Sequence, residues 1–382
     1  MQFDGTVATI RDRVVQTAAK LVLEPIFEAD FEDGAYGYRP RRSGIDAVKE
    51  VHRQLCRGYT DVVDADLSKY FDTIPHSDLL KSVARRIVDR HVLWLIKLWL
   101  QAPVEERDGD GTRRRSGGRS SKRGTPQGGV VSPLLSVIYI NRFLKHWRLS
   151  GRGEAFRAHV VSYADDFVIL SRGHAEEALA WTKAVMTKLG LALNEAKTSV
   201  KNAREESFDF LGYTLGPRHF PEGGRWYLGA SPSKKSVRRI KTKVSELLTP
   251  GNKGTWSEVQ ARLNRLLGGW SAYFSHGALA SVYRAVDDHV YDRVRNFLRK
   301  RHNGARHDAV FLRACLHRTE RAMPLSRARK VAGVCLAMKP VGKPDAGNLH
   351  VRFDERGGET ERCRMAQATA PLLDSTQAWE EE

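Results

Sequence analysis

Residues Val160–Leu170, VVSYADDFVIL, decide how this chain folds. Two runs rich in β-branched and aromatic residues flank one polar pair, Asp165–Asp166, and such runs are typical of short strands joined by a tight turn. The segment therefore predicts a β-hairpin whose turn carries two adjacent carboxylates beside an apolar core.

A second acidic segment is Asp61–Asp66, DVVDAD, which predicts a Val-rich strand with Asp64 and Asp66 on one face. A carboxylate beside a core is costly unless it is paired or binds a cation. Mg²⁺ takes one or two carboxylates together with substrate phosphates, and two such ions can clamp an in-line phosphoryl displacement. The two segments together predict a Mg²⁺ site, whereas each one alone fits a plain turn or hairpin equally well.

The segments around these two alternate helical and strand patterns, which predicts an α+β domain. Between them, Arg107–Arg123 holds seven Lys or Arg and no apolar side chain, so we expect a surface loop or hairpin tip. Helices are expected at Val14–Phe27, Val88–Leu100 and Ala175–Leu189. Two more are expected, one that follows Pro75 and is capped by Ser77 or Asp78, and a buried one that follows the Gly/Pro turn of residues 124–133. Later strands are expected at Thr198–Lys201, Phe208–Thr214 and Trp226–Leu228.

From Ser233 the chain changes character, and three amphipathic helices are expected at 233–248, 256–274 and 282–301. Lys234–Arg301 contains fifteen Lys or Arg and five Asp or Glu, within a chain of net charge +18 and pI near 9.9. A basic helical region after a mixed domain favours a nucleic-acid partner, although a merely basic soluble protein would have the same totals. Trp270, Tyr273 and Phe274 share one helix face and are expected in the core.

Composition argues against several other classes of protein. The four cysteines form no C-x-x-C pair, which argues against a disulfide scaffold and a cysteine-based zinc site. The longest apolar stretches, around Leu93–Leu100 and Val130–Ile140, are shorter than the roughly 20 residues of a membrane span. We therefore expect no membrane partner and a cytoplasmic protein; the bacterial origin that we also expect is implied by the family resemblance given next.

Several collinear stretches lie in order between Ile10 and Leu215: RDRVVQTAAKLVLEPIFEADF, YGYRPRRS, DLSKYFD, PQGGVVSPLLSVIYIN, YADD, LNEAKTSV and FDFLGYTL. They resemble the sequence blocks of reverse transcriptases, and those of group II intron enzymes in particular. The resemblance implies a right-hand polymerase fold, with fingers and an antiparallel palm sheet at 1–216, a helical thumb or maturase region at 217–305 and a weakly structured tail at 306–382.

Carried over position by position, the resemblance makes Asp66 and Asp165 the main ligands of Mg²⁺, with Asp166 supporting them. It gives Asp64 no ligand role, so we expect a structural one. Phe71, five residues after Asp66, would exclude a ribose 2′-OH and so favour deoxynucleotides; ordinary core packing is the alternative.

Three further residues are implied to meet the incoming nucleotide. Gln127 would contact it, and Gly128, with its neighbouring glycine, would let the backbone approach it closely. Lys197 would meet the triphosphate or pass a proton to the leaving pyrophosphate; a lysine on a solvated turn is the alternative.

The stretch Asn264–Phe274 and the basic helix after it resemble the maturase-specific region of group II intron proteins, which serves as the thumb and grips intron RNA. The implied partners are intron RNA, an RNA template with a DNA primer, and dNTPs, with a homodimer as one option. The residues expected to contact RNA are Lys234, Lys235, Arg238, Arg239, Lys241, Arg299, Lys300 and Arg301.

Two departures from the family pattern qualify these expectations. The chain starts MQFDGTVATIRDRVVQ, without the fingers segment that relatives carry before this point, and it lacks the C-x-x-C pairs of an H-N-H endonuclease domain. We therefore expect an N-terminally truncated RNA-directed DNA polymerase of a group II intron, with a maturase role in splicing and mobility. The alternatives are a non-catalytic RNA-binding maturase and an inactive intron remnant.

Overall fold

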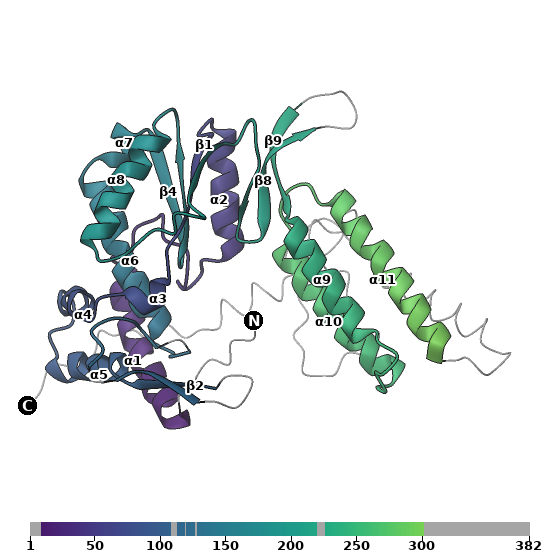
Figure 1. Cartoon of the computed structure of the whole chain (residues 1–382), viewed down its shortest axis with the longest axis horizontal. Coiled ribbons are helices and arrows are strands. Elements are labelled where there is room, and N and C mark those ends of the chain that lie inside the picture. The colour runs from purple at the N-terminus through teal and green to yellow at the C-terminus, as the bar shows by residue number, and fades with distance from the viewer. Residues whose placement is uncertain (1–8, 108–112, 119, 127, 220–225, 302–382) are drawn as a thin grey trace, which may run out of the picture. The chain divides into compact units, whose positions relative to one another are not determined.

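The computed structural model describes residues 9–107, 113–118, 120–126, 128–219 and 226–301. It divides between Ser233 and Lys234 into two compact units. The first unit contains α1 (Ile10–Glu28), α2 (Gly44–Cys56), β1 (Asp61–Asp66), α3 (Tyr70–Thr73), α4 (His76–Ala84), α5 (Arg90–Leu100), β2 (Pro103–Arg107), β3 (Arg113–Gly117), α6 (Ser132–Leu149), α7 (Arg152–Ala155), β4 (Ala158–Tyr163), β5 (Asp166–Ser171), α8 (Ala175–Lys188), β6 (Ser199–Asn202), β7 (Phe208–Phe210), β8 (Tyr213–His219) and β9 (Trp226–Pro232) (Figure 1).

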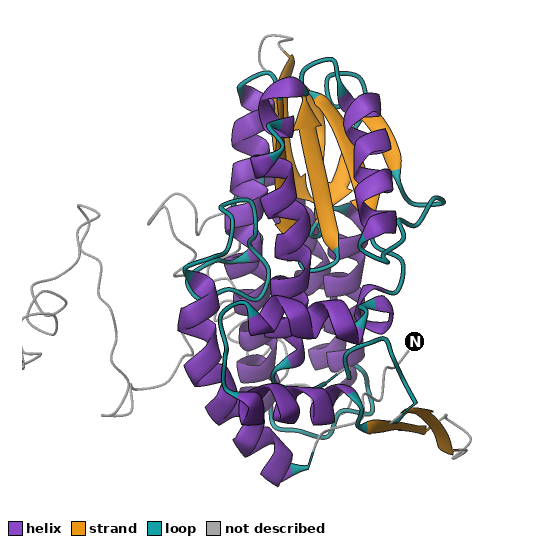
Figure 2. Cartoon of the chain, turned by 90° about the vertical axis from the view of Figure 1, so that its left-hand side faces the viewer, coloured by secondary structure: helices purple, strands orange, loops and turns teal. Residues whose placement is uncertain are grey.

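An antiparallel sheet in the order β4-β5-β1-β6 forms the centre of this unit. Helices cover both sides of it, with α2 on one side and α8 on the other (Figures 1 and 2). Its middle strands β1 and β5 are almost wholly apolar between their ends, as expected of strands covered on both faces. This confirms the predicted α+β fold with an antiparallel palm sheet.

Helix α6 is the main packing element of the first core. Its first half, from Leu134 to Asn141, is buried all round, and this part of its sequence is accordingly almost wholly apolar. Two tyrosine hydroxyls in this core have backbone partners: Tyr70 donates to the carbonyl of Ser136 at 2.6 Å, and Tyr139 to that of Leu189 at 2.6 Å. The buried helix predicted after the Gly/Pro turn is thereby confirmed.

The structure differs from the local expectations at several points. Helix α4 begins at His76 after Pro75, so Ser77 and Asp78 lie in its first turn and do not cap it. Helix α5 begins later than expected because the Asp89 side chain accepts hydrogen bonds from the next backbone N–H groups. Residues 208–214 form two strands, since Leu211 and Gly212 make a left-handed turn between β7 and β8. Helix α2 was not expected at all.

The second unit is a helical region of α9 (Lys234–Leu247), α10 (Trp256–Tyr273) and α11 (Ala280–Arg301). Apolar residues at helical spacing, including Val244, Leu263 and Val294, form its core. Trp270 packs against this core and Phe274 is buried, but Tyr273 keeps 36% of its surface exposed, so the expected core role holds for only two of the three rings.

The helical region begins later than residue 217 because β9 pairs with β8 along its whole length and so belongs to the first unit. The expected tail, 306–382, lies outside the described residues. Among the helices that the structure describes, none is long and apolar enough to cross a membrane.

Candidate active site

The two acidic segments meet at one end of the central sheet. β1 pairs antiparallel with β5, and Asp66 lies opposite Asp166 in that register. The backbone N–H of Leu67 donates to the carbonyl of Asp165 at 3.4 Å. The end of β1 and the YADD turn therefore form a single carboxylate cluster, although they lie far apart in the sequence.

The YADD turn is tight and closely covered. Tyr163 pairs with Asp166, so Ala164 and Asp165 make the turn, with Ala164 in a left-handed conformation (φ 58°); Asp166 is already the first residue of β5. The YGYRPRRS segment lies against this turn, because a Cβ at Gly37 would come within 2.3 Å of the Ala164 nitrogen. Glycine is therefore required at Gly37 for this close approach.

Charge repulsion is built into the cluster. Burial, followed by the negative charges of Asp165, Asp66 and Asp64, raises the pKa of Asp166 to about 6. Carboxylates held together in this way favour a bound cation, and Mg²⁺ prefers such oxygen ligands. Among the described residues, no three side chains of metal-binding type already stand together as a ligand set.

The two carboxylates of β1 have different partners. Asp64 lies 3.6 Å from the Lys201 ammonium on β6; burial raises the pKa of Asp64, and Lys201 opposes that shift. This ion pair supports the structural role expected for Asp64. Asp66 instead accepts from Lys197 at 3.1 Å and from the Asn194 amide at 3.3 Å, with both partners in the turn before β6. Lys197 is therefore brought to the carboxylate cluster, as its candidate role requires.

Phe71 is held beside the loop that carries the predicted nucleotide contacts. Its carbonyl accepts from the backbone N–H of Thr125 at 2.7 Å, just before the PQGG turn. The Phe71 ring is half-buried against the first core, so core packing accounts for part of its surface. Gly128 is exposed with φ 89°, a conformation that favours glycine, and Gln127 lies outside the described residues.

Two residues near the site were given no role by sequence reasoning. The buried Gln16 of α1 accepts from the backbone N–H of Val130 at 2.7 Å and so fixes the end of the PQGG loop. The Tyr38 ring meets the Phe71 ring edge-on, with centroids 6.2 Å apart. Burial and then the Asp165 charge raise the pKa of Tyr38. Tyr38 lies within a recognised block, but only the fold reveals these contacts.

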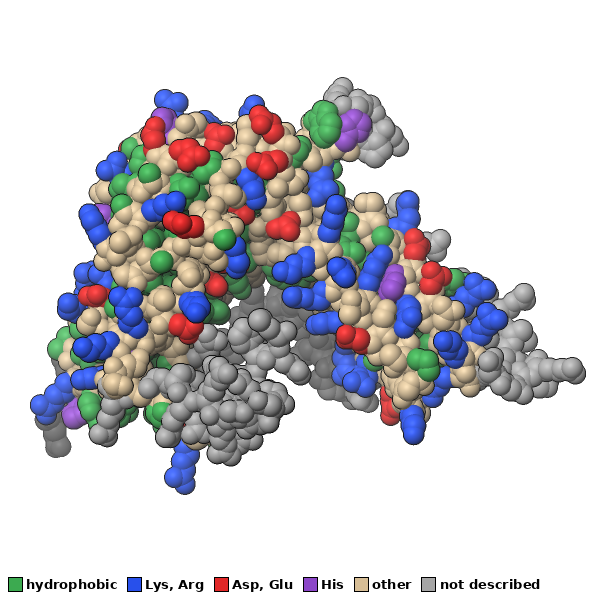
Figure 3. All heavy atoms as spheres, viewed as in Figure 1, with side chains coloured by type: hydrophobic (Ala, Val, Ile, Leu, Met, Phe, Trp, Pro, Cys, Tyr) green, Lys and Arg blue, Asp and Glu red, His purple; other side chains and the backbone are tan. Residues whose placement is uncertain are grey.

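The predicted RNA contacts lie on the helical unit. On α9 the side chains of Lys234, Lys235, Arg238 and Arg239 are exposed and Lys241 is half-buried; Lys and Arg gather over this helix in the space-filling view (Figure 3). None of them forms an ion pair with a carboxylate in the part of the chain that the structure describes. On α11, Arg301 donates to the Gly254 carbonyl at 2.6 Å, so this side chain is partly engaged within its own unit.

Comparison with known proteins agrees with this geometry. Residues 5–215 match the family model "Reverse transcriptase (RNA-dependent DNA polymerase)", and residues 237–316 match "Group II intron, maturase-specific domain". Protein YkfC of Escherichia coli is 33% identical over 63% of this chain and 70% of its own length. The group II intron-encoded protein LtrA of Lactococcus lactis is 28% identical over 55% of this chain and 43% of its own length.

Among solved structures, Candida albicans telomerase in complex with a fragment of telomeric RNA has 13% identity and a TM-score of 0.42, over 80% of this chain and 55% of that one. This similarity is weak, and the fold rests on the family match and the sheet order. The chain spans less than half of LtrA, whereas the reverse transcriptase model alone matches more than half of the chain. The chain belongs to the reverse transcriptases of the group II intron type, with a reverse transcriptase domain followed by a maturase-specific domain.

Proposed function

We propose that this chain is an RNA-directed DNA polymerase that extends a DNA primer on an RNA template with dNTPs and Mg²⁺. The observation that supports this most directly is the pairing of Asp66 with Asp166 across β1 and β5, beside the Asp165 turn. A cluster of carboxylates at a strand end suits the binding of a metal–triphosphate complex.

Asp66 and Asp165 would hold Mg²⁺, with Asp166 in support. When bound, the metal would neutralise the triphosphate and favour in-line attack of the primer 3′-OH on the α-phosphate, with pyrophosphate leaving. Lys197 donates to Asp66, and it would turn to the phosphates once a metal takes its place. Its ammonium would then protonate the leaving pyrophosphate.

The loop residues would select the substrate. Gly128 in its left-handed conformation would leave room for the nucleotide next to the backbone, and Gln127 would contact it. The backbone carbonyl of Phe71 accepts a hydrogen bond from Thr125, which fixes this residue beside the loop. Its ring would collide with a 2′-OH and so favour deoxynucleotides. Tyr38 would support the Phe71 ring from its edge.

Primer extension on an RNA template with dNTPs and Mg²⁺ tests this proposal. The full chain is compared with its Asp165→Asn variant and with Asp33→Asn, an exposed carboxylate paired with Arg42 on the surface. Extension by the parent chain and by Asp33→Asn, but not by Asp165→Asn, is the expected result. Equal extension by all three would refute the assignment of Asp165.

The exposed basic face of α9 favours a second role, that of a maturase that binds intron RNA. The charge on this face has no carboxylate partner within the described part of the unit, so it is available for phosphates. If the chain only binds RNA, Asp165→Asn will leave RNA affinity and splicing intact while no variant extends a primer. If it is an inactive remnant, neither extension nor RNA binding will be detected. A homodimer and a cytoplasmic, bacterial location stay predictions.

A further inference from the structure

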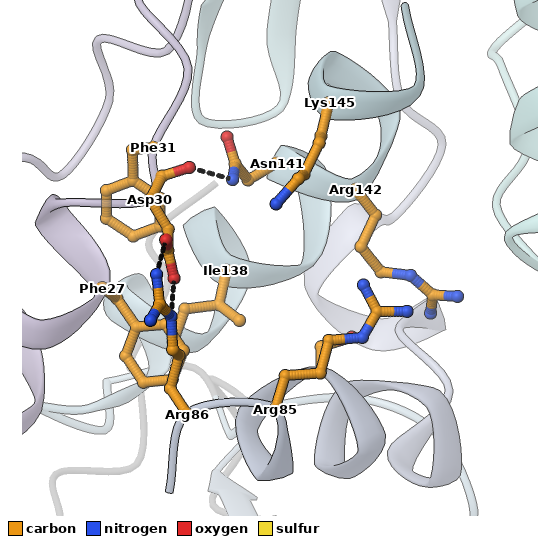
Figure 4. Close-up of a pocket in the computed structure, with 10 residues that line it drawn as sticks. Phe27, Asp30, Phe31, Arg85, Arg86, Ile138, Asn141, Arg142 and Lys145 are labelled. Atoms are coloured by element: carbon orange, nitrogen blue, oxygen red, sulfur yellow. Dashed lines mark hydrogen bonds and ion pairs between the residues drawn. The ribbon is translucent and has the colours of Figure 1, made fainter. Parts of the chain in front are cut away.

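A basic cavity lies on the first unit, lined by residues of α1, α4 and α6 and of the segments that follow α1 and α4 (Figure 4). Its volume is about 170 Å³. The apolar part of its wall comes from Phe27, Phe31 and Ile138. The polar part is formed by Asp30, Ser82, Arg85, Arg86, Asn141, Arg142 and Lys145.

Positive charge in this cavity exceeds negative charge by three. Arg86 forms a two-pronged ion pair with Asp30, and this contact lowers the pKa of Asp30. Arg85, Arg142 and Lys145 line the same cavity, and none of them forms an ion pair with a carboxylate among the described residues. Several positive side chains around one small cavity repel one another, so the binding of an anion between them would be strongly favoured.

The neutral polar groups of the cavity wall are already engaged. The Asn141 amide accepts from the backbone N–H of Glu32 at 2.9 Å and donates to the Asp30 carbonyl at 3.0 Å. The Ser82 hydroxyl donates to the Asp78 carbonyl. These bonds fix the wall and leave the arginines and the lysine as the donors for a ligand.

Arg142 adds a further cation to the cavity wall. Its guanidinium lies over the Tyr139 ring, 5.2 Å from the centroid, and its Nη1 atom is buried. Because Nη1 is buried, an anion in the cavity would be attracted by the positive charge of Arg142 and not bound by this donor. The Arg142 side chain is half-buried and held by its ring contact, so much of its rotamer freedom is already lost before a ligand binds.

We propose that this cavity binds a phosphate group of the RNA backbone, at a site separate from the catalytic carboxylates. Its volume is below the roughly 300 Å³ at which pockets for whole small-molecule ligands begin, but it admits a phosphate group. Arg85 and Lys145 are exposed at its rim, so a phosphate attached to a longer chain can enter. Ile138 and Lys145 lie six and thirteen residues beyond Ser132, the first residue of α6, and so about 9–20 Å along the helix from its start.

The test is RNA affinity, measured by fluorescence anisotropy with a labelled, mixed-sequence RNA hairpin that has single-stranded flanks. The phosphate site rests on the proposed function only in that RNA is taken as the ligand. The binding assay needs no primer extension, so a chain without polymerase activity can still show whether the phosphate site exists. The variant is Arg85→Gln/Arg142→Gln. The control, Lys183→Gln/Lys188→Gln, removes two exposed charges from α8, away from the cavity lining.

The pocket variant should weaken RNA binding about tenfold at low salt and lower the slope of log affinity against log salt by roughly 0.7–0.9 per phosphate lost. The control should change affinity less than about threefold. Arg85→Gln alone should give part of the loss; since Arg85 is exposed just after α4, this variant should retain the fold. Equal effects of the pocket and control variants would overturn the proposal.

A second measurement separates RNA from free phosphate. Inorganic phosphate should raise the melting temperature of the parent chain above that in chloride of equal ionic strength, and the pocket variant should lose this increase. If phosphate stabilises the parent chain but the pocket variant binds RNA normally, the site takes a free anion and the RNA assignment is wrong.

Discussion

The end of the central sheet and the outer face of α9 both leave charge uncompensated, but with opposite sign and in different surroundings. At the sheet end, Asp66, Asp165 and Asp166 lie close together and half-buried, with Lys197 as a nearby cation. On α9, the exposed Lys and Arg are spread along a solvated helix. Buried like charges call for a specific ion at a fixed position, whereas exposed ones attract a polyanion without fixing its register.

The largest effect is expected from Asp66→Asn. This change removes one carboxylate that would hold the metal, so primer extension should fall on the order of 10³-fold, the scale for loss of one charge-stabilising group. Asp64→Asn is the matched control on the same strand, because Asp64 pairs with Lys201 and should act structurally. An equal loss in Asp64→Asn would mean that the two carboxylates share one role, and the contrast between them would fail.

A smaller effect is expected on the basic face. Arg238→Gln/Arg239→Gln should weaken RNA binding about tenfold and make it less salt-dependent, because each lost phosphate contact lowers the salt slope by roughly 0.7–0.9. Primer extension at saturating RNA should change little. Anisotropy titrations at several salt concentrations measure both quantities. If the salt slope stays unchanged, these side chains do not contact phosphates.

Substitution of Phe71 tests whether the sheet end also selects deoxynucleotides. Phe71→Ala should lower the preference for dNTPs over rNTPs about tenfold or more, since the ring would no longer meet a 2′-OH. Phe71→Tyr keeps a ring in place and should retain the preference. Single-nucleotide incorporation with each substrate gives the ratio. If Phe71→Ala loses stability but not selectivity, the ring serves only the core.

The smallest effect concerns stability. The pKa of Asp166 is raised to about 6 in the folded chain, so its ionised form is disfavoured there. Stability without metal should therefore fall as pH rises from about 4 to 6. Asp166→Asn should raise the free energy of unfolding at pH 7 by about 1–2 kcal/mol after allowance for solvent screening, and by nothing near pH 4. Urea unfolding at both pH values, with Asp33→Asn as a neutral control, measures this; a loss of stability at pH 7 would contradict it.

The sequence predicts the sheet end better than the surroundings of the site. β1 has the predicted bounds, because DVVDAD combines strand propensity with a charged end. The contact between Tyr38 and Phe71 was not predictable, since it depends on how the YGYRPRRS segment crosses the YADD turn. The role of Gln16 was hidden for the same reason: its partner, Val130, lies on a different element far along the chain.

In the helical unit, the bounds of the helices were predictable from the sequence, but the contacts of its basic side chains were not. Amphipathic spacing predicted α9, α10 and α11 to within two residues at each end, because each helix has one apolar stripe. Charge counts along Lys234–Arg301 predicted a basic unit, but not that Arg301 would bond to the Gly254 carbonyl within it. Which cations stay free depends on long-range contacts that a helical pattern does not record.

The central claim is that Asp66 and the YADD turn hold the same metal. Metal-directed cleavage tests it most directly: the chain is loaded with Fe²⁺ in place of Mg²⁺, treated with peroxide and ascorbate, and its fragments are mapped by mass spectrometry. We expect cuts near both Asp66 and Asp165, reduced by excess Mg²⁺ and lost together in either Asp66→Asn or Asp165→Asn. Cuts near one segment that persist when the other carboxylate is replaced would contradict a shared site.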